Sequence, residues 1–481
     1  MSNVEYKRAL CFASHANCGV LATVEDGKIT KLEGDPDCAV SDGRVCERMD
    51  FQIEWLDHPK RCNYPLKRVG DRGSGKWERI TWDQACKEIG EKMRYLADEY
   101  GPETVIFSHG TGRTDEWYEG RFFNLYGSPN LAMGGSEICW CPTYTNESAT
   151  YGQFAAAFTA AKTGCVVLWG HNPAQSGDFP EHWGYQDLFA NDPNVKLIVV
   201  DPRCTEYSPN ADVWRRLRPG TDGAMAMGWM NVIINEDLYD HEFVDLWCYG
   251  FDALAERVQE YTVDKVAEIT WIPAEKIVAA AHLLAESKPA TLQWGLAIDM
   301  TREAIPAGQA IAALFQITGN IDCPAGLVPP AEIMAYSGGW GRDLLPEEQE
   351  PKRLGLDRYR LLQMGFKQSS PDVLIETLET GEPYEIHGAH FQTTNGIACM
   401  GAAPRRVYNA FNKCDFIMSV DLFMTPTIMA LADLVMPAAT FPERNGIRVG
   451  DGPQRGEIIN KSRRSANASP TWRSTWNWAS A

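Results

Sequence analysis

Three cysteines near the start of the chain could hold iron. Cys11 and Cys18 enclose the segment CFASHANC, and Cys46 follows within GRVCERMD. Thiolates are the usual ligands of iron–sulfur clusters, in which close cysteines at a turn face one cluster and a distant cysteine completes the set. Ser14 stands where a further cysteine would help, with His15 beside it. Three unrelated buried thiols are the alternative interpretation of this spacing.

Two further cysteines lie close together in the segment GGSEICWCPTYTNE, residues 134–147. Cys139 and Cys141 are separated by one residue, and glycines and a proline flank them. A thiolate in such a segment could serve as a soft ligand for a metal ion. Two buried cysteines in an ordinary loop are the alternative.

Two predicted strands end in segments that suit a nucleotide, LWGHNPAQS and VVDPRCTE. At the carboxyl end of a parallel strand, the loop leads into a helix N-terminus that favours phosphate. Asp201 could accept hydrogen bonds from a ribose or a base edge, and Arg203 could meet a phosphate. A strand-end aspartate before a proline could equally be a helix cap. The region has no GxGxxG motif, which argues against a plain nicotinamide site.

The elements that must position these residues alternate between strands and helices. Residues 19–33 predict two strands around an Asp-Gly turn, and residues 82–101 predict a helix that a glycine ends. The alternation continues at 165–177, 195–203, 223–236 and 415–441. Such alternation is typical of an α/β fold with a parallel sheet. Residues 329–385, rich in Pro, Gly and charged residues, are expected to be irregular.

Length and composition bound the class of protein. The chain has 481 residues, which predicts two or three domains, and its net charge of −19 argues against nucleic acid or an anionic membrane as the main partner. No apolar run is long enough to span a membrane. The start, MSNVEYKRALCF, has neither an apolar signal core nor a twin-arginine pair, so we expect a cytoplasmic location. Fourteen cysteines without a secretion signal favour free thiols and metal ligands over disulfides.

An ordered set of motifs covers the chain from about residue 7 to about residue 461. It comprises the three cysteines followed by CER, and then YPLKRVGDRGSGKWERITWDQA, LYGSPN, ICWCP, GHNPAQS, VVDPRCTE, LRPGTDGAMAMG, QITGN and DLFMTPTIMALADLVMPAATFPERNG. The set resembles the catalytic subunits of the dimethyl sulfoxide reductase superfamily, which use molybdenum or tungsten and two molybdopterin guanine dinucleotides. Within that superfamily it is most similar to enzymes of the acetylene hydratase and catechol dehydroxylase kinds.

The resemblance implies an α/β fold with a small N-terminal iron–sulfur domain rich in β-structure and interleaved Rossmann-like domains. The domains expected are an iron–sulfur domain at 1–60, a discontinuous α/β domain at 61–150 and 375–461, and a dinucleotide-binding α/β domain at 151–374. The superfamily's C-terminal β-rich domain, which closes over the pterins, is expected to be missing.

The resemblance also implies roles for individual residues. Cys139 matches the protein thiolate that ligates the metal. Trp140 stands where formate dehydrogenases have a histidine next to this thiolate, which weakens the case for formate as the substrate. Arg48 matches the cation that bridges the cluster and a pterin. The positions that match cofactor-binding residues are Gly170, Asn172, Asp201, Arg203, Gly220 and Asp222 for one pterin dinucleotide, and Asn395, Asp421 and Thr425 for the other side of the cofactor cleft.

The chain departs from the superfamily at Ser14, where the pattern C-x-x-C-x-x-x-C has its second cysteine. Serine is harder to deprotonate and a harder ligand than cysteine. Three interpretations stay open: a four-iron cluster with Ser14 or His15 as the fourth ligand, a three-iron cluster, or no cluster. We favour a cluster, because Cys11, Cys18, Cys46 and Arg48 are all in place.

His15 has a second possible role. It aligns with a catalytic aspartate of acetylene hydratase, so it could act as a general acid or base near neutral pH. The alternatives are an exposed turn histidine and a cluster ligand.

The function expected is that of an anaerobic molybdenum or tungsten oxidoreductase acting on a small organic substrate. Reductive dehydroxylation of a catechol-like compound is the specific expectation, with electrons passing between the metal and an iron–sulfur partner subunit by way of Arg48 and the cluster. A non-redox hydratase is one alternative, in which the metal acts as a Lewis acid on water. An inactive truncated fragment of such an enzyme is another.

The final residues do not resemble the superfamily. The segment SRRSANASPTWRSTWNWASA has no helix or strand period, and its tryptophans argue against an ordinary disordered tail. Residues 462–481 are therefore predicted to be an out-of-frame tail.

Overall fold

The structure is a computed structural model that describes most of the chain. The described residues are 3–14, 17–39, 41–110, 116–133, 139, 141–152, 156–157, 163–176, 179–329, 342–361, 368–401, 403–449, 456–459 and 461–462. The chain forms two compact units, unit 1 comprising Met1–Ser136 with Glu332–Ala481, and unit 2 comprising Glu137–Ala331. The predicted domain boundaries stay predictions.

Unit 1 begins with a three-stranded antiparallel sheet, β1 (Val4–Leu10), β2 (Gly19–Glu25) and β3 (Lys28–Gly34). The predicted Asp-Gly turn joins β2 and β3, and both turn residues have positive φ, 48° at Asp26 and 80° at Gly27. Such angles match the twist of a tight hairpin. The helix α1 (Arg48–Leu56) packs against β3, and its Leu56 joins Val24 and Ile29 in a small core.

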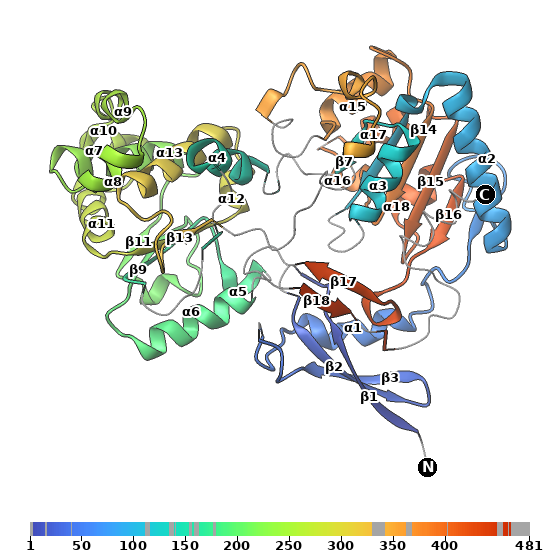
Figure 1. Ribbon diagram of the computed structural model, residues 1–481, viewed down its shortest axis with the longest axis horizontal. Helices are drawn as coiled ribbons and strands as arrows, with labels where there is room; N and C mark the ends of the chain where they lie inside the picture. The colour runs from blue at the N-terminus through green and yellow to red at the C-terminus, as the bar shows by residue number, and fades with distance from the viewer. Residues whose placement is uncertain are drawn as a thin grey trace. The chain divides into compact units, whose positions relative to one another are not determined.

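The main sheet of unit 1 has seven strands in the order β5-β4-β16-β15-β14-β6-β7 (Figure 1). The five strands from β16 to β7 run parallel to one another, whereas β4 pairs in antiparallel fashion with both β16 and β5. Every residue of β6 and β14 is buried, as expected for parallel strands covered on both faces. The strands are β4 (Leu66–Arg68), β5 (Trp77–Arg79), β6 (Val105–His109), β7 (Leu131–Met133), β14 (Gly388–Gln392), β15 (Phe416–Asp421) and β16 (Leu434–Pro437).

Helices cover both faces of this sheet. Val105 and Phe107 of β6 pack in a core with α2, whereas Ile106 between them packs in a core with α15 and α17. The predicted helix at 82–101 is α2 (Trp82–Tyr100), which Thr81 caps and Gly101 ends. The other helices are α3 (Glu116–Tyr126), α15 (Pro371–Thr380), α16 (Gly396–Cys399), α17 (Pro404–Phe411) and α18 (Pro426–Leu431), and β17 (Gly446–Val449) pairs with β18 (Gly456–Ile459).

The helix α15 differs from the sequence prediction, which made residues 329–385 irregular. Pro371 occupies the first helical position after Ser370, and Gly381 ends the helix in the left-handed conformation. Leu374 and Leu378, four residues apart, are buried on one face. The surrounding prolines and glycines therefore mark the ends of a short helix rather than a loop.

Unit 2 contains a parallel sheet with the strand order β11-β10-β9-β12. The chain builds outward from β9 to β10 and β11, and then returns to place β12 on the other side of β9. In open α/β sheets, ligands bind at the carboxyl ends of the strands where the order reverses in this way. The strands are β9 (Cys165–Trp169), β10 (Lys196–Val200), β11 (Val213–Arg215) and β12 (Ala290–Trp294), and β8 (Ala156–Ala157) pairs with β13 (Leu327–Val328).

Helices also cover both faces of the unit 2 sheet. Cys165, Val167 and Trp169 join the core with α7, α11 and α13, whereas Val166 and Leu168 join the core with α6. The helices are α4 (Cys141–Tyr151), α5 (Pro173–Ser176), α6 (Phe179–Asn191), α7 (Asp222–Asn235), α8 (His241–Trp247), α9 (Phe251–Val258), α10 (Val263–Thr270), α11 (Ala274–Glu286), α12 (Leu296–Asp299) and α13 (Ala304–Ile317). The predicted α/β alternation is confirmed.

The state of the cysteines agrees with the expectation, drawn from the composition, that they do not form a disulfide framework. All fourteen lie within the described residues, and none of them forms a disulfide. Only Cys204 and Cys399 among them are exposed. No helix in the described part of the chain is long and apolar enough to cross a membrane.

Candidate functional site

The three predicted cluster cysteines gather in the N-terminal sheet of unit 1. The backbone N–H of Cys11, after β1, donates to the carbonyl of Cys18 at 2.9 Å, which closes the loop that carries Ser14. Burial raises the pKa of the Cys18 thiol to about 12, and the neighbouring Cys11, Cys46 and Cys38 add to this shift. The thiol therefore stays protonated at neutral pH unless a metal displaces its proton. This set of soft donors fits an iron–sulfur cluster.

Cys38 belongs to this group, although the sequence analysis did not select it. Its Sγ accepts a hydrogen bond from the N–H of Gly19, beside Cys18, at 3.2 Å. The signal available in the sequence was an additional cysteine between Cys18 and Cys46, in a chain whose motif lacks one thiol at Ser14.

The structure describes two of the three other residues that were predicted to lie near the cluster. Ser14 is half-buried, and His15 lies outside the described residues. Arg48 is the first residue of α1 and is also half-buried. The N–H of Met49 donates to the carbonyl of Cys46 at 3.0 Å, so this cysteine is joined directly to the first turn that carries Arg48.

Predicted cofactor residues of unit 2 lie at the carboxyl edge of its parallel sheet. Gly170 follows β9, Asp201 follows β10, and Asp222 begins α7. The indole Nε1 of Trp169, the last residue of β9, donates to Asp222 Oδ1 at 2.9 Å. Asp201 in turn lies close enough to Asp222 for their charges to interact. The structure thus brings both carboxyl groups together beside the end of β9.

The backbone at this edge is shaped by glycines. Gly170 has a φ of 58°, and a Cβ placed on Gly295, after β12, would lie 2.2 Å from the Gly170 carbonyl oxygen. Side chains would therefore prevent the two strand ends from meeting. Gly220 has a φ of 81° and open space where a Cβ would project. Bare backbone at a strand-order reversal fits the close approach of a dinucleotide phosphate.

Asn172 carries a buried polar atom without a hydrogen-bond partner among the described residues. Its Nδ2 donates to Glu206 Oε2 at 2.6 Å, whereas its Oδ1 is buried and unpaired. A buried acceptor of this kind is costly unless a ligand satisfies it. Glu206 was not selected from the sequence, although it ends the motif VVDPRCTE, and its hydrogen bond from Asn172 lowers its pKa. The unpaired oxygen fits an N–H or O–H of a nucleotide.

Asp201 and Arg203 form a turn rather than a helix cap. The N–H of Arg203 donates to Asp201 Oδ1 at 2.8 Å, and the side chain of Arg203 is exposed. Burial raises the pKa of both Asp201 and Asp222. The turn leaves a partly buried carboxyl group and an exposed guanidinium side by side, which suits a nucleotide's hydroxyl and phosphate groups.

Cys139 lies in a turn just before α4, half-buried, whereas Cys141 is buried inside that helix. The helix is fixed by Thr143, whose Oγ1 donates to Asp299 Oδ1 at 2.7 Å in a buried contact. Asp299 ends α12, which directly follows Gly295 and the end of β12. The first turn of α4 is therefore joined to α12 at the carboxyl edge of the unit 2 sheet, and Cys139, just before this turn, is the less buried of the two cysteines.

Predicted residues of unit 1 lie at the carboxyl edge of that unit's own sheet. Asn395 Oδ1 accepts from Thr427 Oγ1 at 2.6 Å, and Thr425 caps α18 by accepting from the N–H of Ile428 at 3.3 Å. Asp421 ends β15, and burial raises its pKa to about 6 although nearby backbone N–H groups oppose the shift. These polar groups are thus largely satisfied by each other and by the backbone.

A buried group of ionisable residues in unit 1 gave no signal in the sequence. His109 Nδ1 lies 3.9 Å from Glu119 Oε2, and each side chain is 1% exposed. Burial lowers the pKa of His109 to about 4 and that of His390 to about 3, to which the proximity of His109 contributes. Both imidazoles are therefore neutral at physiological pH.

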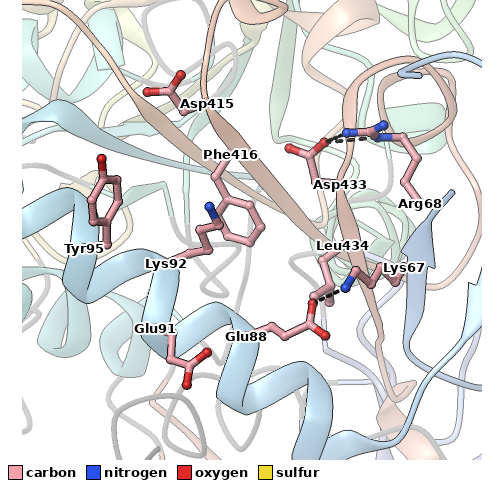
Figure 2. Close-up of a pocket in the computed structure, with 10 residues that line it drawn as sticks. All are labelled: Lys67, Arg68, Glu88, Glu91, Lys92, Tyr95, Asp415, Phe416, Asp433 and Leu434. Carbon is pink, nitrogen blue, oxygen red and sulfur yellow. Dashed lines mark hydrogen bonds and ion pairs between the residues drawn. The ribbon is translucent and has the colours of Figure 1, made fainter. Parts of the chain in front are cut away.

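A surface hollow of about 500 Å³ lies at the opposite edge of the unit 1 sheet (Figure 2). Phe416, the first residue of β15, lies in its wall, so the hollow is at the amino ends of the strands. Two pairs of its charged groups interact, with Lys67 Nζ 2.9 Å from Glu88 Oε2 and Arg68 bound to Asp433. It therefore lies away from the edge that carries Asp421.

Comparison with known protein families identifies the family of the N-terminal segment and of the rest of the chain. Residues 6–56 match the molybdopterin oxidoreductase Fe4S4 domain, and residues 61–470 match the molybdopterin oxidoreductase family. The chain belongs to the molybdopterin oxidoreductase family. The predicted superfamily, α/β fold and cofactor classes, a molybdopterin carrying molybdenum or tungsten and an iron–sulfur cluster, are therefore confirmed.

Individual relatives support the same assignment. Acetylene hydratase of Syntrophotalea acetylenica is 34% identical over 468 residues, which cover 91% of this chain and 63% of the relative. The molybdopterin-containing subunit of thiosulfate reductase from Salmonella typhimurium is 28% identical, over 91% of this chain and 58% of the relative. The chain thus spans about three fifths of these relatives.

A solved structure shows the same fold. Acetylene hydratase from Pelobacter acetylenicus superposes with a TM-score of 0.89 at 31% identity, covering 98% of this chain and 69% of that one. The roles of individual site residues stay predictions.

Proposed function

We propose that this chain is the catalytic part of a molybdenum or tungsten enzyme that binds bis(molybdopterin guanine dinucleotide) and acts on a small organic substrate. The observation that carries the proposal is the unpaired, buried Oδ1 of Asn172 at the carboxyl edge of the unit 2 sheet. It lies two residues after Gly170, whose backbone approaches that of Gly295 too closely for side chains. A ligand with hydrogen-bond donors and phosphates satisfies both features.

The residues at this edge would bind different parts of the guanine dinucleotide. Asn172, Asp201 and Asp222 accept hydrogen bonds from the base and ribose, while Arg203 and the glycine backbone meet the phosphates. Cys139 supplies a thiolate to the metal. When bound, the metal–pterin group supplies either a two-electron centre that exchanges oxygen with the substrate or a Lewis acid that activates water.

The reaction that we propose is reductive dehydroxylation of a catechol-like ring. One aromatic C–O bond breaks, a C–H bond forms, and two electrons and two protons yield the phenol and water. An iron–sulfur partner protein supplies the electrons in the cytoplasm. Arg48 supports electron transfer into the cluster, because a cation two residues from Cys46 stabilises the negative charge of the added electron.

Hydration is the second candidate, and the 34% identity to acetylene hydratase favours it. Water would then add to a carbon–carbon triple bond with no net electron transfer. In that reaction His15 would move a proton, since an imidazole titrates near neutral pH.

The deciding experiment is an electron balance. The chain is produced anaerobically with molybdate or tungstate, and is then offered catechol with reduced methyl viologen or acetylene without a donor. We expect two electrons consumed for each phenol formed. Hydration of acetylene without donor oxidation would establish the hydratase instead, and the absence of both reactions would contradict both candidates.

Metal coordination tests the role of Cys139 separately. Because the pterins carry the metal, the variant Cys139→Ala should retain both pterin and metal but lose one sulfur ligand, as measured by X-ray absorption at the molybdenum or tungsten edge. Cys141→Ser is the matched control two residues away, and its metal should keep every sulfur ligand. An unchanged number of sulfur ligands in Cys139→Ala would contradict ligation by Cys139.

A further inference from the structure

Four thiols, rather than three, meet in the N-terminal part of unit 1. The thiols of Cys11, Cys46 and Cys38 all lie within electrostatic range of the thiol of Cys18. Neighbouring thiols suit an iron–sulfur cluster, in which each iron takes one thiolate.

Cys38 is held against the start of β2, directly after its neighbour Cys18. The N–H of Gly19 donates to Cys38 Sγ at 3.2 Å, and the N–H of Asp35 donates to the Gly19 carbonyl at 2.9 Å. A Cβ on Gly19 would lie only 2.4 Å from the Cys38 Cβ. The absence of a side chain at this position therefore allows the thiol to lie beside Cys18.

The loop that presents Cys38 is fixed by its own hydrogen bonds. The carbonyl of Asp35 accepts from the N–H of Cys38 at 3.1 Å, and the carbonyl of Cys38 accepts from the N–H of Asp42 at 2.8 Å. The Asp35 carboxylate accepts from the N–H of Asp37 at 3.0 Å and pairs with Arg8 Nε at 3.1 Å. Both backbone groups of Cys38 are thus held, which directs its side chain toward Gly19.

We propose that Cys38 supplies the fourth thiolate of a four-iron cluster, replacing the ligand that Ser14 does not provide. A thiol loses its proton near pH 8.5 in water and binds iron as a soft ligand, whereas an aliphatic hydroxyl does neither. The cluster is then held by Cys11, Cys18, Cys38 and Cys46. This inference rests on the cluster domain and is independent of the organic reaction proposed above.

The test compares variants at the two positions. The chain is reconstituted anaerobically with iron and sulfide, and iron content and electron paramagnetic resonance are measured in the oxidised and reduced states. Wild type and Ser14→Ala should each hold about four irons and show a four-iron signal on reduction. Cys38→Ser should show the three-iron signal in the oxidised state, or lose its iron.

Two controls separate ligation from folding. Cys86→Ser removes a buried thiol from α2, outside the group, and should leave the cluster unchanged. The double variant Ser14→Cys/Cys38→Ser moves the fourth thiol and should regain about four irons. The proposal is wrong if Cys38→Ser keeps the four-iron signal, if Ser14→Ala loses it, if wild type holds only three irons, or if the double variant folds without a four-iron cluster.

Discussion

The two parallel sheets present the same kind of edge and use it differently. At the carboxyl edge in unit 2, Asn172 keeps a buried acceptor unpaired. At the corresponding edge in unit 1, the side chain of Asn395 is occupied by Thr427, and Thr425 caps a helix. At the unit 1 edge, Gln392 Oε1 at the end of β14 is also buried without a partner among the described residues. The comparison teaches that topology locates an edge, whereas the hydrogen bonds of each side chain show which residues a ligand would satisfy and which residues hold the fold. We therefore expect substitutions at the unit 2 edge mainly to reduce the amount of bound cofactor. Substitutions at the unit 1 edge should mainly lower the free energy of unfolding.

The largest expected effect concerns the buried ion pair that supports the unit 1 edge. Arg61 binds Glu443, with both side chains 1% exposed, and donates to the carbonyl of Ala438 at 3.2 Å, just after β16. Arg61→Ala leaves a buried carboxylate uncompensated and should lower the free energy of unfolding by about 3–5 kcal/mol. A urea titration measures this, with the exposed Arg121 replaced by alanine as the control. A loss under 1 kcal/mol would show that the edge does not depend on this pair.

The next effect depends on pH, through Asp421. Burial raises its pKa from 3.8 to about 6 in the folded chain, so the folded state favours the protonated form. The resulting destabilisation is absent below the unfolded pKa, grows as pH rises between about 4 and 6, and is complete above about 6. Asp421→Asn should therefore stabilise the cofactor-free chain by up to about 3 kcal/mol at pH 7 and by nothing near pH 4.

Unfolding curves at both pH values check this, with Asp71→Asn as an exposed control in the loop between β4 and β5. A gain that is equal at both pH values would contradict the assignment of the pH dependence to Asp421.

A paired substitution tests the comparison itself. Asn395→Ala removes the acceptor of two Thr427 hydrogen bonds and should cost about 1–3 kcal/mol of stability. Asn172→Ala removes the unpaired Oδ1 together with the Nδ2 hydrogen bond to the exposed Glu206, so it should cost less stability and should reduce the guanine nucleotide released from the purified protein. Thermal melts and nucleotide analysis of both variants are needed. Interchanged results would reverse our assignment of the two edges.

The smallest effect is expected in the charged hollow at the amino ends of the unit 1 strands. Lys67 and Glu88 form a solvent-exposed pair, whose removal by Lys67→Ala should change stability by less than about 1 kcal/mol. Cofactor content should not change. A measurable loss of pterin in this variant would show that the wrong edge of the sheet has been assigned.

Local signals in the sequence predicted much of the fold. The Asp26-Gly27 turn, the start of α2 at Trp82 and its end at Gly101 depend on neighbouring residues alone, and they are found as predicted. The helix Pro371–Thr380 was missed because its capping residues resemble loop residues when their ends are not known.

The candidate site was less accessible to sequence reasoning. Cys38 is drawn to the cluster group by a contact with Gly19, nineteen residues away, and the burial of His109 and His390 depends on a sheet formed by distant segments. Both features arise only when the chain is folded, so the additional cysteine between Cys18 and Cys46 signalled a further thiol without showing where that thiol would lie.

The exposed cysteines offer a practical consequence. Cys204 follows Arg203 at the unit 2 edge, and Cys399 ends α16, which begins after Asn395 at the unit 1 edge. The other twelve thiols are buried or half-buried. A maleimide dye would therefore attach first at these two positions, and replacing either cysteine leaves a single label. The native chain thus provides one fluorescent reporter position beside each edge, without any engineered cysteine.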